Sequence, residues 1–441
     1  MTKRNLTSIL LLCVFIFTLL SGCGQAQVTP SATPAAQDSP APAATPTPSP
    51  SPEPTPEPTP QPDPVEVLLS TLTAEQKVGQ LLVGGFEGTS AGADAVRAIQ
   101  EYQVGGLILY QRNVESLEQL AGLTNTLKAL NGGHIPLFLT TDEEGGLVTR
   151  MPPEITDIPA ALTFGSIEDA ERRLNACYTL GGTLARLCAA FGISMNYAPV
   201  LDVWSNPENT VIGSRSFSTD PLTAAYAAAE TAYGMMDAGV IPTVKHFPGH
   251  GDTTVDSHAD LPVVDKSLEE LERLELAPFR EAIRPERFFG AYEEGRGAVP
   301  AVMVGHILLT ALDGQRPASL SPAVVTGLLR EDMGFDGLIC TDDLTMGAVS
   351  DTYSLEEAAV LAVEAGCDML LVCHGADNLT TARDALLSAV ESGRISRERL
   401  DESVRRILSL KLEYGVTNDP VPTPDADALN QTVADLLALV P

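Results

Sequence analysis

The sequence predicts an α/β fold in which a single folded domain forms a (β/α)8 barrel of the TIM type. Three observations carry this prediction: eight short apolar runs, helical patterns between most of them, and polar residues at the ends of several runs. Apolar runs separated by helices are typical of parallel strands that helices cover. Eight such strands close into a barrel, for which about 250 residues or more is usual. The alternative is a doubly wound open sheet, in one or two lobes.

Residues 1–23 are expected to be a lipoprotein signal peptide that lies outside the fold. Lys3 and Arg4 precede an apolar run, residues 9–20, that is short for a permanent membrane-spanning helix. The run ends in the tetrapeptide LSGC, which closes at Cys23 and resembles the lipobox of bacterial lipoproteins. That resemblance implies a lipid on Cys23 that anchors the protein to the outer face of the bacterial cytoplasmic membrane. An ordinary secretion signal with a chance cysteine is the alternative.

Residues 24–64 are expected to form a disordered tether. Pro, Thr, Ser, Ala, Gln and Glu dominate this stretch, and apart from its prolines no apolar residue is larger than Val28. Such a segment cannot bury a core, and it favours an extended polyproline II conformation. At ~3.1 Å per residue, the tether would reach on the order of 100 Å.

The charge of the chain restricts its partners. It has 27 basic and 58 acidic residues, which give a formal net charge of −31. So acidic a protein repels phosphate backbones and anionic lipid headgroups, so nucleic acid is not expected as a partner. Contact with a membrane is expected only through the N-terminal lipid, and an uncharged ligand fits better. We expect a monomer.

Cysteines are not expected to form a disulfide framework. Beyond residue 23 the chain has five, all in apolar segments and none in a CxxC pair: Cys177, Cys188, Cys340, Cys367 and Cys373. An odd number without a spacing pattern predicts buried thiols that act as small hydrophobic side chains.

The folded domain is expected to span residues 65–415, followed by a polar tail, residues 416–441, with a short helix. A capping box of Thr73 and Gln76 starts its first predicted helix. The predicted strands are Gln80–Gly84, Gly106–Tyr110, Leu137–Thr141, Ser194–Pro199, Ile241–Lys245, Ala301–His306, Gly337–Thr341 and Met369–Cys373. The predicted helices are Val114–Leu130, Asp169–Ala190, Pro221–Ala238, Glu356–Ala365, Asn378–Ser392, Ser396–Tyr414 and Ala426–Leu439. A loop insertion is predicted at residues 288–296.

Polar side chains stand at or just past the C-terminal ends of these strands. They are Asp142, Asp202, Lys245, His246, His306 and Asp342. In a barrel such ends converge on one mouth, where the catalytic groups of this fold lie. The convergence favours the barrel over the open sheet.

Residues 245–262 hold three of the chain's six histidines and are predicted to form an active-site loop. Phe247-Pro248-Gly249 separates His246 from His250 and breaks the helical spacing of a zinc site, so neither a metal nor a cofactor is expected. In Asp256-Ser257-His258, an extended backbone would point the acid and the histidine to the same side. A carboxylate beside an imidazole supports proton transfer near neutral pH. The alternative is a surface loop with a chance Asp–His pair.

Two further segments carry candidate site residues. Asp342 directly follows a predicted buried strand, where a carboxylate is rigid and partly desolvated, as a nucleophile must be. The alternative is that Asp342 caps the helix that follows. Asp142 and Arg150 flank a Gly-Gly turn, and a carboxylate with a guanidinium suits hydrogen bonding to vicinal hydroxyls. Arg215 could face the same cavity or form a structural ion pair.

Taken together, these segments resemble the family 3 glycoside hydrolases, and within them the bacterial β-N-acetylglucosaminidases (β-hexosaminidases). The most specific match is KHFPGHGD at residues 245–252 followed by DSH at 256–258. The segments Asp142 to Arg150, Gly213 to Phe217 and Thr341 to Leu344 match in order and spacing, and the resemblance runs from Leu72 to about Gly415. There are two departures. Glu143 stands where many relatives have Gln, and we expect no C-terminal domain of the kind that some Gram-positive relatives carry.

The resemblance implies a role for each matching residue. Asp342 is expected to be the nucleophile that forms a covalent glycosyl-enzyme, and His258, paired with Asp256, the acid/base. The residues expected to bind the sugar are Asp142, Arg150, Arg215, Lys245 and His246. Because His258 lies in a Gly-rich loop, we expect it to move in over the bound sugar.

The implied reaction is hydrolysis, with retention, of terminal β-linked GlcNAc from cell-wall muropeptides or chito-oligosaccharides. Two alternatives stay open. An imidazole acid/base does not repel phosphate as a carboxylate would, so phosphorolysis to a sugar 1-phosphate is the first. The second is a non-catalytic sugar-binding lipoprotein, which predicts two lobes.

Overall fold

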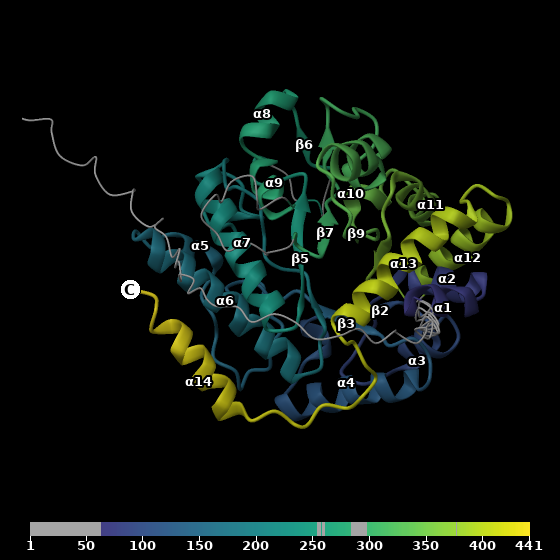
Figure 1. The fold of residues 1–441 in the computed structure, drawn as a ribbon, viewed down its shortest axis with the longest axis horizontal. Helices are drawn as coiled ribbons and strands as arrows, with labels where there is room; N and C mark the ends of the chain where they lie inside the picture. The colour runs from purple at the N-terminus through teal and green to yellow at the C-terminus, as the bar shows by residue number, and fades with distance from the viewer. Residues whose placement is uncertain (1–62, 254–256, 258–260, 284–297, 376) are drawn as a thin grey trace, which may run out of the picture. The chain divides into compact units, whose positions relative to one another are not determined.

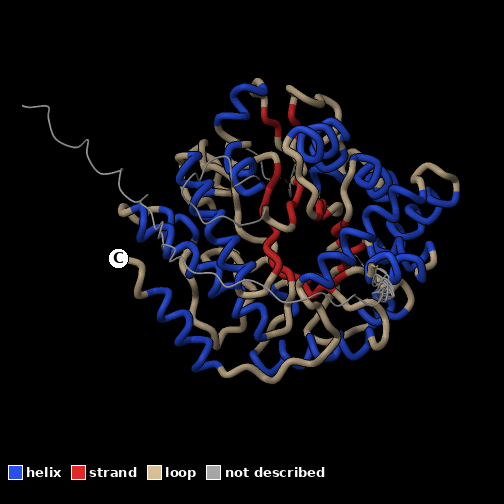
Figure 2. Tube along the Cα trace, in the orientation of Figure 1, coloured by secondary structure: helices blue, strands red, loops and turns tan. Residues whose placement is uncertain are grey.

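Eight parallel strands close into a barrel in the computed structural model (Figure 2), which describes residues 63–253, 257, 261–283, 298–375 and 377–441. The order around the ring is β1-β2-β3-β4-β5-β7-β9-β10, and β10 pairs in parallel with β1. This closure confirms the predicted (β/α)8 barrel and excludes the open sheet. The barrel strands are β1 (Leu82–Gly84), β2 (Gly106–Leu109), β3 (Phe138–Thr141), β4 (Met195–Asn196), β5 (Ile241–Phe247), β7 (Ala301–Val304), β9 (Leu338–Asp343) and β10 (Met369–Val372).

Helices surround the barrel (Figure 1). They are α1 (Pro64–Thr71), α2 (Ala74–Gln80), α3 (Ala93–Gln100), α4 (Leu117–Asn131), α5 (Ala161–Gly165), α6 (Ala170–Ala190), α7 (Pro221–Asp237), α8 (Leu268–Arg273), α9 (Ala277–Ile283), α10 (Gly347–Ser350), α11 (Leu355–Ala365), α12 (Asn378–Glu391), α13 (Arg397–Glu413) and α14 (Ala426–Leu437), with the shorter turns η1 (Gln111–Asn113), η2 (Gly213–Arg215) and η4 (Ala318–Leu320) and the π-helix η5 (Ala323–Asp332). Local sequence sets where several of them begin. The predicted capping box of Thr73 and Gln76 is present at α2, and Ser116, Asp169 and Asp220 accept a hydrogen bond from the third N–H of α4, α6 and α7. Such caps satisfy N–H groups that have no partner within the helix.

Six strands end at other residues than predicted, and the differences at β4, β5 and β9 bear on the site. β5 runs two residues past the predicted end, so Lys245 and His246 both lie on the strand. β9 extends to Asp343, which makes Asp342 a strand residue. β4 is shorter than predicted, because the N–H of Ala198 turns back to the carbonyl of Asn196 (2.8 Å) and leaves the ladder. Lys245 and His246 are held by the chain after β4: the N–H of Lys245 donates to the carbonyl of Pro199 at 3.2 Å, and the N–H of His246 donates to the carboxylate of Asp202 at 3.3 Å.

A second, small sheet was not predicted, since two-residue strands show no readable alternation. It pairs β6 (Val263–Val264) in parallel with β8 (Leu308–Leu309). The N–H of Leu308 also donates to the carbonyl of Pro262, at 2.8 Å. This sheet fixes the point at which the predicted active-site loop, residues 245–262, rejoins the described chain.

The C-terminal tail is folded. α14 packs against α6, and its Val433 and Leu436 side chains are fully buried. At the other end, Asp63 caps α1 and Pro64 begins it, although both were expected in the tether. The five cysteines predicted to be buried are buried as free thiols.

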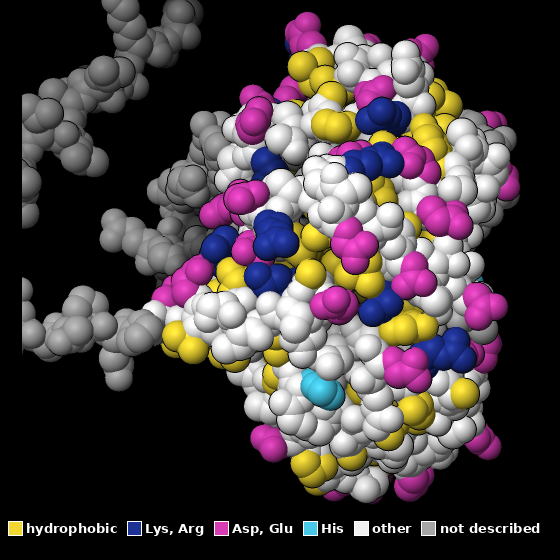
Figure 3. Space-filling view, turned by 90° about the vertical axis from the view of Figure 1, so that its right-hand side faces the viewer, with side chains coloured by type: hydrophobic (Ala, Val, Ile, Leu, Met, Phe, Trp, Pro, Cys, Tyr) yellow, Lys and Arg dark blue, Asp and Glu magenta, His cyan; other side chains and the backbone are white. Residues whose placement is uncertain are grey.

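Other sequence predictions concern residues outside the described part of the chain. These are the lipobox Cys23, the tether up to residue 62 and the insertion at 288–296. Among the helices that are described, none combines the length and the apolar character needed to cross a membrane. Figure 3 shows Asp and Glu side chains spread over one face of the molecule, with Lys and Arg among them.

Candidate active site

Asp342 lines a pocket of about 190 Å³ at the C-terminal mouth of the barrel. Its Oδ1 accepts one hydrogen bond from the described residues, donated by the N–H of Asp343 at 2.8 Å. Asp342 does not cap the helix that follows, because α10 begins after Met346. The N-cap alternative is therefore wrong, and the carboxylate faces a pocket with most of its acceptor positions unused.

The chain after β3 folds into a tight hairpin, residues 142–150, which we call the β3 hairpin. Its ends are joined by the N–H of Glu144, which donates to the carbonyl of Val148 at 2.9 Å. Glu143 is buried, and its Oε2 accepts hydrogen bonds from the N–H of Arg150 (2.6 Å) and the hydroxyl of Thr149 (2.9 Å). The Nε of Arg150 is buried with no partner among the described residues. The hairpin thus holds a guanidinium in the pocket wall with donor capacity left for a ligand.

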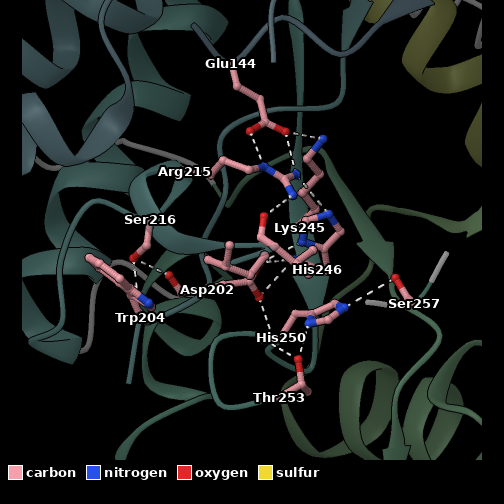
Figure 4. A network of polar contacts seen from close by, with 12 residues as sticks. Glu144, Asp202, Trp204, Arg215, Ser216, Lys245, His246, His250, Thr253 and Ser257 are labelled. Atoms are coloured by element: carbon pink, nitrogen blue, oxygen red, sulfur yellow. Dashed lines mark hydrogen bonds and ion pairs between the residues drawn. The ribbon is translucent and has the colours of Figure 1, made fainter. Parts of the chain in front are cut away.

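An ionic network joins the β3 hairpin to β5 (Figure 4). Lys245 Nζ lies 2.6 Å from Asp142 Oδ1 and 2.7 Å from Glu144 Oε1. Arg215 binds Glu144 through two parallel hydrogen bonds, from Nε and Nη2, each of 2.8 Å. A bidentate pair of this kind fixes both planes. Both interpretations of Arg215 therefore hold, since it forms a structural ion pair and also lines the pocket with Asp142 and Lys245.

His246 is held from behind by Asp202. The Nδ1 of His246 lies 2.7 Å from Asp202 Oδ2, and the N–H of His250 donates to Asp202 Oδ1 at 2.7 Å. This contact fixes the imidazole orientation and leaves its Nε2, which lies 3.5 Å from Arg215 Nη2, on the pocket side. Asp202 was expected at a strand end but was not predicted as a site residue, although its position after β4 indicated that it lies at the barrel mouth.

Ser257 is the described residue of the predicted acid/base tripeptide, and Asp256 and His258 lie outside the described residues. The hydroxyl of Ser257 lies 3.3 Å from His250 Nε2, and His250 Nδ1 lies 2.6 Å from the hydroxyl of Thr253 (Figure 4). The carbonyl of Ser257 accepts the N–H of Ala348 in α10, at 3.1 Å. The middle of the tripeptide is therefore tied both to the β5 loop and to the helix that follows Asp342.

Comparison with known proteins identifies the family. The model of the glycosyl hydrolase family 3 N-terminal domain matches residues 73–410. The chain belongs to glycosyl hydrolase family 3. It is 34% identical over 337 residues to a β-hexosaminidase of Idiomarina loihiensis, with 76% of this chain and 96% of the relative covered. It is 33% identical over 334 residues to β-hexosaminidase A of Pseudoalteromonas piscicida, with 71% of this chain covered, and it spans about half of that relative's length, 54%.

Solved structures agree with this assignment. A family 3 β-N-acetylglucosaminidase from a Paenibacillus species superimposes with a TM-score of 0.75 at 42% identity, covering 84% of this family 3 chain and 69% of the other. A β-N-acetylhexosaminidase from Beutenbergia cavernae gives a TM-score of 0.69 at 30% identity, covering 78% and 99%. Both the predicted family and the predicted fold are confirmed.

Electrostatics keep the Asp342 of this family 3 glycoside hydrolase ionised. Burial by itself would raise the pKa of Asp342, but His306, His246 and the N–H of Asp343 outweigh it and hold that pKa below its ordinary value. The carboxylate is therefore charged at neutral pH and short of hydrogen-bond donors. A nucleophile that attacks a sugar carbon needs both properties.

Glu144 and Lys245 are also charged. Burial opposes ionisation of Glu144, yet Arg215 and Lys245 lower its pKa well below the ordinary value. Burial likewise opposes the ammonium of Lys245, yet Asp142 and Glu144 raise its pKa above the ordinary value. The wall of the pocket is thus a fixed array of ion pairs that can exchange hydrogen bonds with hydroxyl groups without changing protonation.

His306 supports the strand end that carries Asp342, a role that was not foreseen. The imidazole is fully buried, with Nδ1 2.7 Å from the hydroxyl of Ser319 and Nε2 2.9 Å from the carbonyl of Asp343. Since the carbonyl can only accept, Nε2 carries the proton. Ser319 lies in η4, too far along the sequence for this pair to be read from spacing.

No group of three or more His, Cys, Asp or Glu residues within the described ranges is arranged to hold a metal ion. A larger cavity, about 670 Å³, lies elsewhere and is lined by Asp336, Arg406 and Tyr414 among others. It shares no residue with the pocket of Asp342, and it opens at the N-terminal ends of β7 and β9. The smaller pocket is the candidate active site because the nucleophile candidate and the ion pairs of the β3 hairpin meet there.

Proposed function

We propose that the protein is a retaining β-N-acetylglucosaminidase that removes terminal β-linked GlcNAc from cell-wall muropeptides or chito-oligosaccharides. The observation that carries the proposal is the state of Asp342: an ionised carboxylate with one hydrogen bond from the described residues, on a strand that faces the pocket. Retention requires such a group to form a covalent glycosyl-enzyme. The names of the relatives support the choice of sugar, and the closed barrel gives no support to a two-lobed binding protein.

The sugar would be held by the ion pairs of the pocket wall. Asp142 offers a carboxylate and Lys245 an ammonium at 2.6 Å from it, so adjacent hydroxyls of a ring could bind to both at once. Arg150 lines the same pocket and adds one donor, its Nε, that has no partner among the described residues. In this scheme His246 Nε2 faces the ring, whereas Arg215 acts mainly by fixing Glu144.

Departure of the leaving group needs an acid, which we assign to His258 with Asp256 as its partner. The support lies in the described neighbour Ser257, whose carbonyl is bound by α10 and whose hydroxyl meets His250. These contacts bring Ser257 to the helix that follows Asp342. The acid would protonate the glycosidic oxygen and then, as a base, activate the water that releases the sugar.

The test is turnover of a chromogenic N-acetylglucosaminide beside the matching glucoside, with and without phosphate. We expect release from the N-acetylated substrate, and free GlcNAc as the product whether or not phosphate is present. Mass spectrometry of the trapped glycosyl-enzyme should find the sugar on the peptide that contains Asp342. Product appearing as a sugar 1-phosphate would establish the phosphorylase instead, and absence of turnover on every glycoside would refute the proposal.

We also propose that a lipid on Cys23 anchors the protein to the outer face of the cytoplasmic membrane, with residues 24–62 as the tether. The support is the LSGC tetrapeptide after a short apolar run. Expression of the full chain with labelled palmitate should give a labelled membrane-bound protein. A Cys23→Ala variant should lose both the label and membrane retention, and a labelled variant would contradict the assignment.

A further inference from the structure

The C-terminal strap, residues 416–437, lies along the outside of the barrel between α13 and α6 (Figure 1). Two asparagines fix its first half to backbone groups. Asn125 of α4 accepts the N–H of Val421 (2.8 Å) and donates to its carbonyl (2.9 Å), and Asn418 donates to the carbonyls of Gly132 and His134 (3.1 and 3.3 Å). The second half is α14, with its buried Val433. The strap is thus held along its whole length.

A third asparagine joins the strap to a segment near the active site. Asn430 of α14 accepts the N–H of Thr156 at 2.7 Å and donates to the carbonyl of Glu154 at 2.9 Å. The amide therefore binds the backbone of residues 152–160 on both its donor and its acceptor side. Ile155 and Ile158 of this segment are buried, so the segment is packed beneath as well as bound from outside.

The same segment supports the turn of the β3 hairpin. The N–H of Gly146 donates to the carbonyl of Ile158 at 2.7 Å. A Cβ on Gly146 would lie 2.7 Å from the Cβ of Ala160, closer than real side chains approach, and φ of Gly146 is +61°. The turn and the segment are therefore in direct backbone contact, and only glycine fits there.

We infer that the strap positions the β3 hairpin from outside, with Asn430 as the positioning residue. The contacts run from Asn430 through Thr156 and Ile158 to Gly146, and the hairpin then presents Asp142 and Arg150 to the pocket. The effect on catalysis rests on the proposed function, since it assumes that the hairpin binds the sugar. The support that the strap gives to the hairpin does not rest on the proposed function, because it depends on the contacts alone.

The experiment compares Asn430→Ala with Asn418→Ala in the full chain. Both variants remove a side-chain clamp on the strap, but Asn418 binds at residues 132–134, which precede the N-terminal end of β3, whereas the hairpin follows its C-terminal end. For Asn430→Ala we expect KM for a chromogenic N-acetylglucosaminide to rise by roughly three- to tenfold with kcat little changed. Asn430→Asp, which keeps the acceptor for Thr156 and loses the donor, should fall between the wild type and Asn430→Ala.

Amide hydrogen exchange tests the link without any assay of activity. Exchange of the amides of Gly146 and Val148 should become faster in Asn430→Ala and stay at the wild-type rate in Asn418→Ala. Equal exchange in the two variants, or a KM that rises equally in both, would overturn the inference. If the wild type turns over no N-acetylglucosaminide, the proposed function fails, while the exchange comparison still decides whether the strap supports the hairpin.

Discussion

Two aspartates at opposite ends of the barrel have opposite surroundings. Asp342, near the C-terminal end of β9, accepts one hydrogen bond from the described residues and opens onto the pocket. Asp368, directly before β10, is fully buried and saturated. Its carboxylate meets the hydroxyl of Ser403 (2.9 Å), the N–H of Ile339 (3.1 Å) and the guanidinium groups of Arg330, Arg399 and Arg406.

The comparison distinguishes a charged group that holds the fold together from one that is available for a reaction. A carboxylate whose lone pairs are all occupied can hold elements together, but it cannot accept a new partner without losing an old one. Asp368 joins the start of β10 to α13 and to η5 in this way. Asp342 keeps its acceptor capacity and relies on neighbouring positive groups to stay ionised. Asp368 is both fully buried and saturated with hydrogen bonds, whereas Asp342 is partly exposed and keeps free acceptor positions.

The largest effect is expected from Asp342→Asn. An amide cannot attack the sugar carbon, so kcat should fall by at least about a thousandfold. Because few contacts are lost, the thermal midpoint should stay close to that of the wild type. Steady-state kinetics and a thermal melt measure both. A variant that retained most of its turnover would remove Asp342 from the mechanism.

Asp368→Asn should show the reverse pattern. Loss of this charge leaves three arginines at a buried site, and the free energy of unfolding should fall by about 3–5 kcal/mol. Urea unfolding measures the change, and kcat of the folded fraction should be preserved. Asp336→Asn is the control, because Asp336 is 94% exposed and binds Arg406 at 3.2 Å, so its loss should change stability little. Equal losses in the two variants would contradict the structural role of Asp368.

Arg150→Met tests whether the guanidinium in the pocket wall, with its unpaired Nε, binds the ligand. Charged hydrogen bonds contribute about 1.5–3 kcal/mol each, so kcat/KM should fall by roughly 10- to 100-fold. Arg394→Met gives a matched control on the surface, since Arg394 binds Glu357 and Glu364 at an exposed site. An unchanged kcat/KM in Arg150→Met would mean that the guanidinium does not meet the substrate.

Glu143 lies between the two extremes, because it is buried and accepts two neutral donors. Burial raises its pKa to about 7, despite the hydrogen bonds from Arg150 and Thr149. A raised pKa in the folded state means that the folded protein binds the extra proton, so stability is lost as pH rises from about 4.5 to 7. Glu143→Gln should remove this loss, and it should be more stable than the wild type at pH 8 by roughly 3 kcal/mol. At pH 4 the two should unfold alike in urea; a constant difference at all pH values would exclude this titration.

The sequence alone could predict the fold and the pocket because both depend on local patterns. Each buried strand is a short apolar run, and a charged residue at its end, such as Asp342 or Lys245, must lie at the barrel mouth once the strands are parallel. The extent of β5 to Phe247 could not be read, since Lys245 and His246 interrupt the apolar run and proline and glycine follow Phe247 at once.

What could not be predicted depends on contacts between distant segments. Glu144 contacts Lys245 and Arg215 only after β3 and β5 have paired into the barrel. No spacing in the sequence predicts these ion pairs. The same holds for His306 with Ser319 in η4. The tail was predicted as a helix but not as a packed one, because two buried side chains, Val433 and Leu436, give too weak a periodic signal.

The pairing of β1 with β10 has a consequence for how the protein is made. The barrel's first strand ends at Gly84 and its last partner begins at Met369, so the ring cannot close until nearly all of the domain has been synthesised. At about 5–20 residues per second, β1 waits roughly 15 to 60 s with one edge unpaired. An open strand edge is where chains pair wrongly with one another. The unpaired edge of β1 is therefore a point at which the nascent chain needs protection from pairing with other chains.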